Sequence, residues 1–178
     1  EIGLFDLQDV NSSYLMRLEN LYLKYSTKEL TILLGKQGVR TPILNPQDGR
    51  LSPTLIEGLV VNWNSSTSTI DAGIITQISP RSTDGWYSVG RSVGINPAAV
   101  NTDGTKALYP QNIDSKWLAY IGYTIALSKE LKVQIWDYHA DRLLNCALVQ
   151  ANADIELSSN RHKLLTAVQV TGETAIGD

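Results

Sequence analysis

Hydrophobic and polar residues alternate along much of this chain, and short groups of turn-forming residues separate the alternating runs. A period of two is typical of β-strands, whose successive side chains point to opposite faces of a sheet. Strong helix signals are scarce. The pattern predicts an all-β, antiparallel fold with strands near residues 14–26, 30–38, 55–65, 69–79, 116–128, 131–140, 145–157 and 162–173.

The connections between these strands fall into two length classes. Short connections are expected at residues 26–29, 65–68, 128–130 and 158–161, and long ones at 39–54 and 80–115. Tight turns at one rim and long loops at the other are typical of a transmembrane β-barrel. A soluble β-sandwich has no reason to sort its connections in this way. The lengths therefore favour a membrane barrel over a soluble β-sandwich binding module.

The alternation also assigns a lipid face and a lumen face to three strands. The lipid set comprises Ile70, Ala72, Ile74, Thr76, Ile78, Trp117, Ala119, Ile121, Tyr123, Ile125, Leu127, Ala147, Val149, Ala151, Ala153, Ile155 and Leu157. The lumen set comprises Asp71, Gly73, Ile75, Gln77, Leu118, Tyr120, Gly122, Thr124, Ala126, Leu148, Gln150, Asn152, Asp154 and Glu156. Four successive polar side chains, from Gln150 to Glu156, would be costly in a packed core. They cost little beside water, so they indicate a wet interior.

Composition excludes several other classes of protein. The chain has 178 residues, enough for one domain, and a mean hydropathy of −0.11. No stretch approaches the 18 apolar residues of a membrane-spanning helix, but barrel strands do not need one. The net charge of −3 gives no reason to expect a nucleic-acid partner. Cys146 is the only cysteine, which excludes an intrachain disulfide.

Catalytic motifs are missing from the sequence. His139 and His162 are the only histidines, and no Gly-x-Ser-x-Gly segment accompanies them. The glycines at residues 90–94 do not form a nucleotide-binding pattern. The sequence therefore predicts neither an enzyme nor a protein that requires a cofactor or a metal.

A polar, Pro-rich reversal lies between two alternating runs from Leu30 to Asn64. Its ordered signature residues are Gly35, Lys36, Gln37, Thr41, Pro42, Asn45, Asp48, Arg50, Pro53, Thr54, Glu57 and Gly58. This stretch resembles the hairpin that links two neighbouring barrel strands in the OprD-like family of Gram-negative outer-membrane porins. The resemblance implies that the chain is an internal segment, a single partial β-barrel domain, of an eighteen-stranded barrel in the bacterial outer membrane.

The resemblance also implies passive diffusion of small polar solutes that bear carboxylates or are amino-acid-like. In that family a row of basic side chains follows the wall, and loops fold inward to narrow the pore. Loop 80–115 is the expected constriction, anchored by Trp86 and Tyr87; the alternative is an outward loop. The expected pore-lining and constriction residues are Lys36, Arg40, Asp48, Arg50, Arg81, Asp84, Arg91, Gln150, Asn152 and Asp154. The alternative for each charge is a solvated loop position.

The expected partners are the lipid bilayer, lipopolysaccharide and the permeating solutes. Other outer-membrane subunits or further copies of the chain are also considered. Some of four aromatic side chains, Trp63, Trp117, Tyr123 and Trp136, are expected in the interfacial girdles. The alternative function is a non-transporting barrel subunit that acts as a structural partner in a larger outer-membrane complex.

Overall fold

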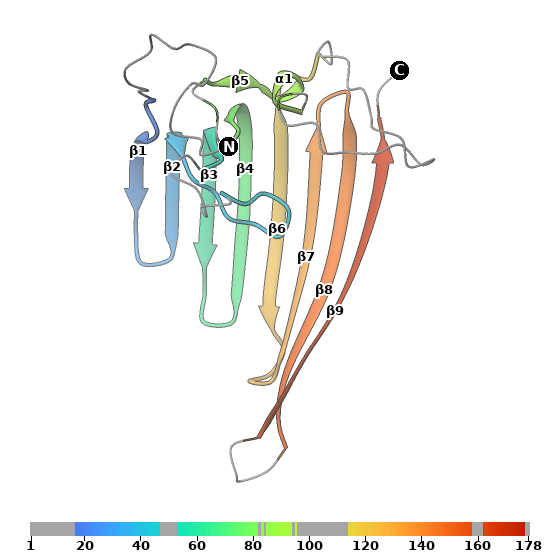
Figure 1. Ribbon diagram of the computed structural model, residues 1–178. Helices are drawn as coiled ribbons and strands as arrows, with labels where there is room; N and C mark the ends of the chain where they lie inside the picture. Colours follow the sequence, from blue (N-terminus) through green and yellow to red (C-terminus); the bar gives the residue numbers. More distant parts are fainter. Residues whose placement is uncertain are drawn as a thin grey trace. The chain divides into compact units, whose positions relative to one another are not determined.

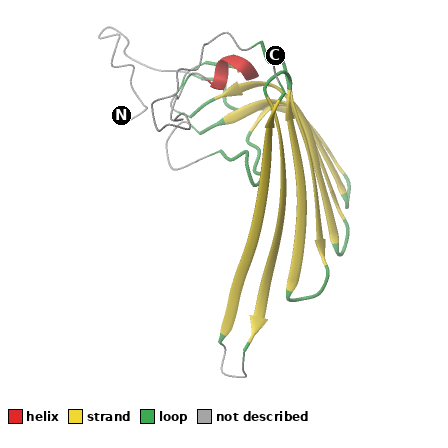
Figure 2. Ribbon diagram, turned by 90° about the vertical axis from the view of Figure 1, so that its right-hand side faces the viewer, coloured by secondary structure: helices red, strands yellow, loops and turns green. Residues whose placement is uncertain are grey.

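Strands account for nearly all the regular structure in the computed structural model (Figure 2). The structure describes residues 17–46, 53–81, 83, 85–93, 95, 114–157 and 162–176. Within these ranges the elements are β1 Leu21–Ser26, β2 Leu30–Gln37, β3 Leu55–Asn64, β4 Ser68–Ser79, β5 Tyr87–Ser88, α1 Val89–Val93, β6 Leu118–Ala126, β7 Leu131–Ala140, β8 Leu144–Glu156 and β9 Lys163–Ala175. No helix in the described ranges is long and apolar enough to cross a membrane.

The strands form one sheet in the order β1-β2-β3-β4-β6-β7-β8-β9, and β5 pairs with β4 (Figure 1). Apart from β5, each strand pairs with its neighbour along the chain. From β6 to β9 the pairing is antiparallel and its register is unbroken. Because directly opposite residues share a face, this register fixes which side chains line each side of the sheet.

The chain divides into two compact units. One unit comprises Glu1–Leu23, Leu34–Leu59 and Ile75–Trp117, and the other comprises Lys24–Leu33, Val60–Ile74 and Leu118–Asp178.

Each of three short turns begins with a hydroxyl side chain that closes it. The hydroxyl oxygens of Thr27, Ser65 and Ser128 accept hydrogen bonds from the backbone N–H groups of the residues three positions later, at 3.0, 3.0 and 3.1 Å. Serine and threonine favour turns because they can satisfy backbone donors locally. These residues therefore explain where the strands reverse.

The short turns lie side by side at one end of the second unit. The N–H of Asn64 donates to the carbonyl of Glu29, that of Ala126 to Thr67, and that of Asp154 to Glu130, at 2.8 to 2.9 Å. These bonds connect three consecutive turns. Antiparallel pairing brings the β8–β9 connection to the same end, where Leu157 N–H donates to His162 O at 3.0 Å.

The β7–β8 turn is an exception to the expected sorting by length. Residues 141–143 form a tight turn at the end of β7 that lies away from the β6–β7 turn. Arg142 closes this turn with a φ of 54°. Antiparallel neighbours need only a reversal of the chain, and a short turn supplies it. The length of a connection therefore does not by itself predict the end of the sheet at which it lies.

Two segments differ from the structure expected from the sequence. Residues 17–20 lie within the predicted strand 14–26, but β1 begins only at Leu21. Segment 80–115, which the sequence predicts as one long loop, contains β5 and α1. In β5, Tyr87 pairs with Ile78 and Ser88 pairs with Gln77, so the chain returns along the end of β4. This pairing satisfies backbone groups that a free loop would leave to water.

Candidate functional site

One face of the β6–β9 sheet is apolar and exposed. Ile121, Tyr123, Ile135, Val149, Val168 and Val170 share this face, and each is at least 40% exposed. An exposed apolar face of this extent favours contact with lipid. The assignment of Ile121 and Val149 to lipid in the sequence analysis agrees with this face.

The opposite face of the same strands carries a buried aromatic cluster, defined here as Tyr120, Trp136 and Tyr138. The rings of Trp136 and Tyr138 are nearly parallel, with centroids 6.0 Å apart and an interplanar angle of 12°. Tyr120 lies 6.1 Å from Tyr138 and 6.4 Å from Trp136, also measured between centroids. Trp136 packs against Gly122, which is directly opposite it in the register.

Trp136 is therefore not a girdle residue. It is only 5% exposed and lies on the face away from lipid, with its indole N–H donating to Gln134 Oε1 at 3.0 Å. Its place late in β7 suggested a position at the membrane boundary. The register contradicts this expectation, because Trp136 lies opposite Leu148 and not opposite a residue of the exposed apolar face. Trp117 and Tyr123 remain exposed, at 37% and 40%.

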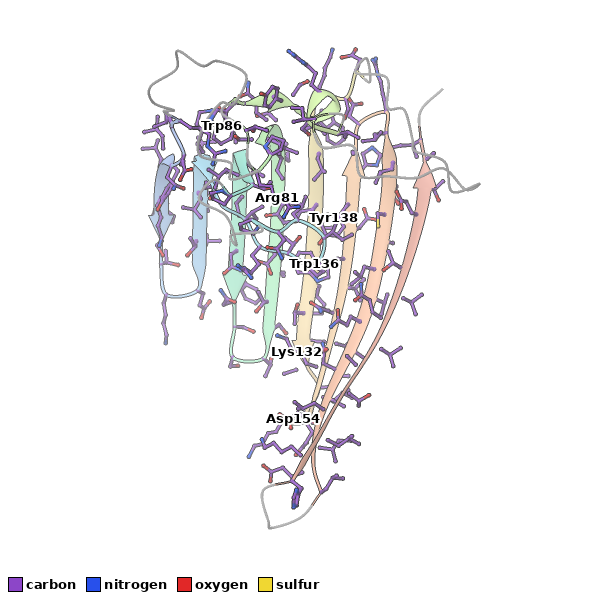
Figure 3. All side chains as sticks on the ribbon, in the orientation of Figure 1. Arg81, Trp86, Lys132, Trp136, Tyr138 and Asp154 are labelled. Carbon is purple, nitrogen blue, oxygen red and sulfur yellow. The ribbon has the colours of Figure 1, made fainter. Side chains whose placement is uncertain are left out.

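We call the face that carries the aromatic cluster the inner face. Polar side chains follow the cluster along it (Figure 3). Gln134 lies opposite Gln150, and Lys132 lies opposite Asn152. Gln150 donates to Asn152 Oδ1 at 2.8 Å. Asp154 lies 3.8 Å from Lys163, which also approaches Glu156 at 3.6 Å. The predicted pore-lining residues Gln150, Asn152 and Asp154 thus share the inner face of β8, opposite the apolar surface.

Two pairs of polar side chains connect β3 and β4. The amide of Asn62 donates to Asp71 Oδ1 at 2.6 Å, and Thr69 donates to Asn64 Oδ1 at 2.9 Å. Asp71 belongs to the predicted lumen set. Hydrogen bonds between neighbouring strands therefore fix these polar groups in place.

In the first unit, the side chain of Arg17 contacts several segments of the chain. Its side chain is 5% exposed and forms an ion pair with Glu19 at 2.7 Å. It also donates to Ser79 Oγ and to the carbonyls of Thr83 and Pro53, at 3.0 to 3.1 Å. Charge-assisted bonds of this kind are stronger than neutral ones. Arg17 therefore fixes the start of segment 80–115 against the residues before β1 and β3.

Lys36 acts on the same segment through Trp86. Its ammonium group forms an ion pair with Glu57 and lies 3.8 Å from the centroid of the Trp86 ring. The Trp86 indole N–H donates to the carbonyl of Leu18 at 3.1 Å. A cation over a Trp face is attracted by the ring's quadrupole. Lys36 thus has a carboxylate partner and an aromatic partner within the first unit.

The other described candidates from the basic set are exposed. Arg40, Arg81 and Arg91 all lie at the surface of the first unit. The guanidinium carbon of Arg91 is 5.9 Å from the centroid of the Tyr87 ring. The backbone N–H of Arg81 donates to Thr54 Oγ1 at 3.1 Å. The candidates Asp48, Arg50 and Asp84 lie outside the described residues.

Metal-binding geometry is not found in the described ranges. No three His, Cys, Asp or Glu side chains of those ranges come together as possible ligands. His139 lies in β7, opposite Ala119 and Asn145, whereas His162 precedes β9. Cys146 is buried in β8, opposite Tyr138.

A family comparison decides what this two-faced sheet belongs to. Residues 8–174 match the profile of the family described as outer membrane porin, OprD family. The chain belongs to the OprD family. Its location is therefore the bacterial outer membrane, and the family's character as a non-enzymatic channel agrees with the missing catalytic motifs. No curated protein sequence matches the chain.

Solved porins share the fold of this OprD-family chain. OpdQ of Pseudomonas aeruginosa matches with a TM-score of 0.69 at 16% identity, over 88% of this chain and 40% of its own. OccD3 (OpdP) of the same organism matches with a TM-score of 0.71 at 20% identity, over 90% and 36%. OccAB4 of Acinetobacter baumannii gives 0.69 at 15% identity, over 88% and 36%. The chain thus corresponds to a segment of a larger β-barrel, spanning two fifths or less of each of these porins.

Several residues of the inner face were not singled out from the sequence. Lys132, Gln134 and Gln169 lie on it, but faces were assigned only to three other strands. Extending the period-two alternation to β7 and β9 would have found them. Arg17 is different, since its partners Pro53, Ser79 and Thr83 are far away in sequence and leave no local pattern.

Proposed function

We propose that the full-length protein is a diffusion channel for small polar solutes that bear carboxylates or are amino-acid-like. The observation that carries this proposal is the contrast between the two faces of the β6–β9 sheet. One face exposes Ile121, Val149 and Val170, while the other presents Gln134, Gln150 and Asn152. An apolar outside and a polar inside suit a water-filled barrel in lipid.

The basic residues of the first unit support selectivity for carboxylates. An arginine stays charged at any relevant pH and presents a planar fork that suits a carboxylate. Arg40, Arg81 and Arg91 are exposed, so they are the described candidates for this role. Lys36 is a further candidate from the same unit, and it pairs with Glu57.

Contacts of Thr83 and Trp86 support the proposal that segment 80–115 forms the constriction. Arg17 donates to the carbonyl of Thr83, and the ammonium group of Lys36 lies over the Trp86 ring, so contacts within the first unit hold both residues. A constriction needs such a fixed wall, because selectivity depends on where the charges lie.

The test is ion conductance of the purified full-length protein in a planar bilayer. We expect stepwise current increases as single channels insert, and a reversal potential in a salt gradient that indicates anion preference. A correctly inserted protein that never conducts would contradict the proposal. That result would favour the alternative function as a structural partner in a larger outer-membrane complex.

A further inference from the structure

Three glutamines and a threonine form one row across four strands on the inner face. The register pairs Thr124 with Gln134, Gln134 with Gln150, and Gln150 with Gln169. Directly opposite residues have Cβ atoms about 4.5–5.5 Å apart and point to the same side. This glutamine row is accordingly a continuous band of amides, with Gln134 and Gln150 half-buried and Gln169 exposed.

Each glutamine is held by a residue two positions along its own strand. Gln134 Oε1 accepts from the indole N–H of Trp136, Gln150 donates to Asn152 at 2.8 Å, and Gln169 donates to Thr171 at 3.5 Å. The glutamines do not bond to one another. These bonds use the carbonyl oxygen of Gln134 and the amide nitrogens of Gln150 and Gln169, and they do not use the amide nitrogen of Gln134 or the carbonyl oxygens of Gln150 and Gln169. The row therefore offers both donors and acceptors to a solute.

Charges near the row do not favour one sign. On the same face Lys132 lies opposite Asn152, and Asp154 follows two positions later on β8. Lys163 lies within 4 Å of both Asp154 and Glu156. Cations and anions are thus mixed beyond the row, whereas the row itself is neutral.

We infer that the glutamine row binds the hydroxyl or amide groups of uncharged polar solutes, or uncharged parts of them, as they pass. This inference rests on the proposed channel function. It adds a solute-binding site to the constriction proposed for segment 80–115. A hydroxyl can accept from the amide of Gln134 and donate to the carbonyl of Gln150. A carboxylate can only accept, so it can bond the amide of Gln134 but not the carbonyl oxygens of Gln150 and Gln169.

The size of the effect follows from neutral hydrogen bonds. Each such bond contributes a factor of roughly two to ten in affinity. A binding site of this kind binds weakly, which suits a channel, because a solute must also leave.

The experiment compares glucose with succinate, a carboxylate that has no hydroxyl or amide group, as probes of single full-length channels in a planar bilayer. Each probe's dissociation constant is taken from its concentration-dependent block of the ion current. In the triple variant Gln134→Leu, Gln150→Leu, Gln169→Leu, we expect the constant for glucose to rise at least fivefold. The constant for succinate should rise by no more than about twofold, because its carboxylates can accept only from the amide of Gln134.

Ala167→Leu is the matched control. Ala167 lies opposite Asn152, on the same face and two positions from Gln169, so the control adds a leucine without removing an amide. It should leave the glucose constant within twofold of the wild type. If the triple variant does not insert, the three single variants provide the test, each with a rise of about twofold.

The outcomes separate this inference from the proposed function. Wild-type channels that conduct but whose ion current is not blocked by glucose would contradict the proposal that the glutamine row binds solutes. An equal loss of glucose and succinate block in the triple variant would also overturn it, since that result indicates a general change in the pore. A full-length protein without any conductance would instead contradict the proposed function itself.

Discussion

At the scale of single residues, two positions require glycine for reasons of space and geometry. Gly35 in β2 has a φ of 130°, a conformation that residues with a side chain rarely adopt. A Cβ at Gly35 would also meet the backbone of Leu21 and Tyr22. Gly122 has an ordinary strand conformation, but the ring of Trp136 occupies the space where a Cβ would project.

The substitution Gly122→Ala should therefore destabilise the barrel. The new methyl group must displace Trp136, and through it Tyr138, which is typical overpacking and costs about 1–3 kcal/mol. Gly172→Ala is the matched control, because no atom lies within 4 Å of the position of its Cβ. The measurement is urea unfolding of each variant, as full-length protein, in liposomes. Equal unfolding midpoints for the two variants would contradict the described packing of Trp136.

Some residue-level features were beyond prediction from the sequence. Alternation placed Gln150, Asn152 and Asp154 on one face of β8, because a strand's geometry is local. The contacts of Arg17 and the stacking of Trp136 on Tyr138 depend on which strands meet and in which register. The position of Trp136 late in its strand carried no information about its face until the register was known.

At the scale of the elements, the strand ends follow from local chemistry. Thr27, Ser65 and Ser128 mark the turns in the sequence and also close them by hydrogen bonds. By contrast, β5 and α1 were not predicted. A two-residue strand has too little sequence for an alternating pattern, and β5 exists only because β4 provides its pairing partner.

The face assignment makes a prediction at this scale. An arginine on the lipid face near mid-membrane costs about 2–4 kcal/mol. Ile121→Arg should therefore impair refolding into liposomes, since Ile121 is 56% exposed on the apolar face. Asn152→Arg, on the inner face beside Lys132, should refold like the wild type. The readout is the folded fraction of the full-length protein, and equal folding of both variants would contradict the assignment.

At the scale of the whole molecule, the sheet described here has two open edges, at β1 and β9. The solved OprD-family porins that it matches are longer barrels, of which the chain covers 36–40%. The inner face of β6–β9 carries both Lys132 and acidic residues such as Asp154, so it does not form a basic track. We therefore expect charge selectivity to depend on the exposed arginines of the first unit.

The last prediction concerns that selectivity in the full-length channel. A unit charge about 10 Å from an ion in water contributes about 0.4 kcal/mol, which is roughly twofold in the partition of each ion and roughly fourfold in the ratio of anions to cations. Arg81→Ala and Arg91→Ala should each shift the reversal potential toward cation preference by an amount of this order. The shift should be clear at 0.01 M salt, where the Debye length is about 30 Å, and nearly vanish at 1 M, where it is about 3 Å.

Lys129→Ala is the control for this measurement, because it removes the same charge from an exposed position in the β6–β7 turn. The turn follows the last residue of β6, whereas segment 80–115 precedes the first, so the nine residues of the strand separate the two. The control should leave the reversal potential unchanged at 0.1 M salt, where the Debye length is about 10 Å. Channels that keep wild-type selectivity in both arginine variants would remove Arg81 and Arg91 from the pore. An equal shift in Lys129→Ala would instead indicate that overall charge sets the selectivity, without a localised constriction.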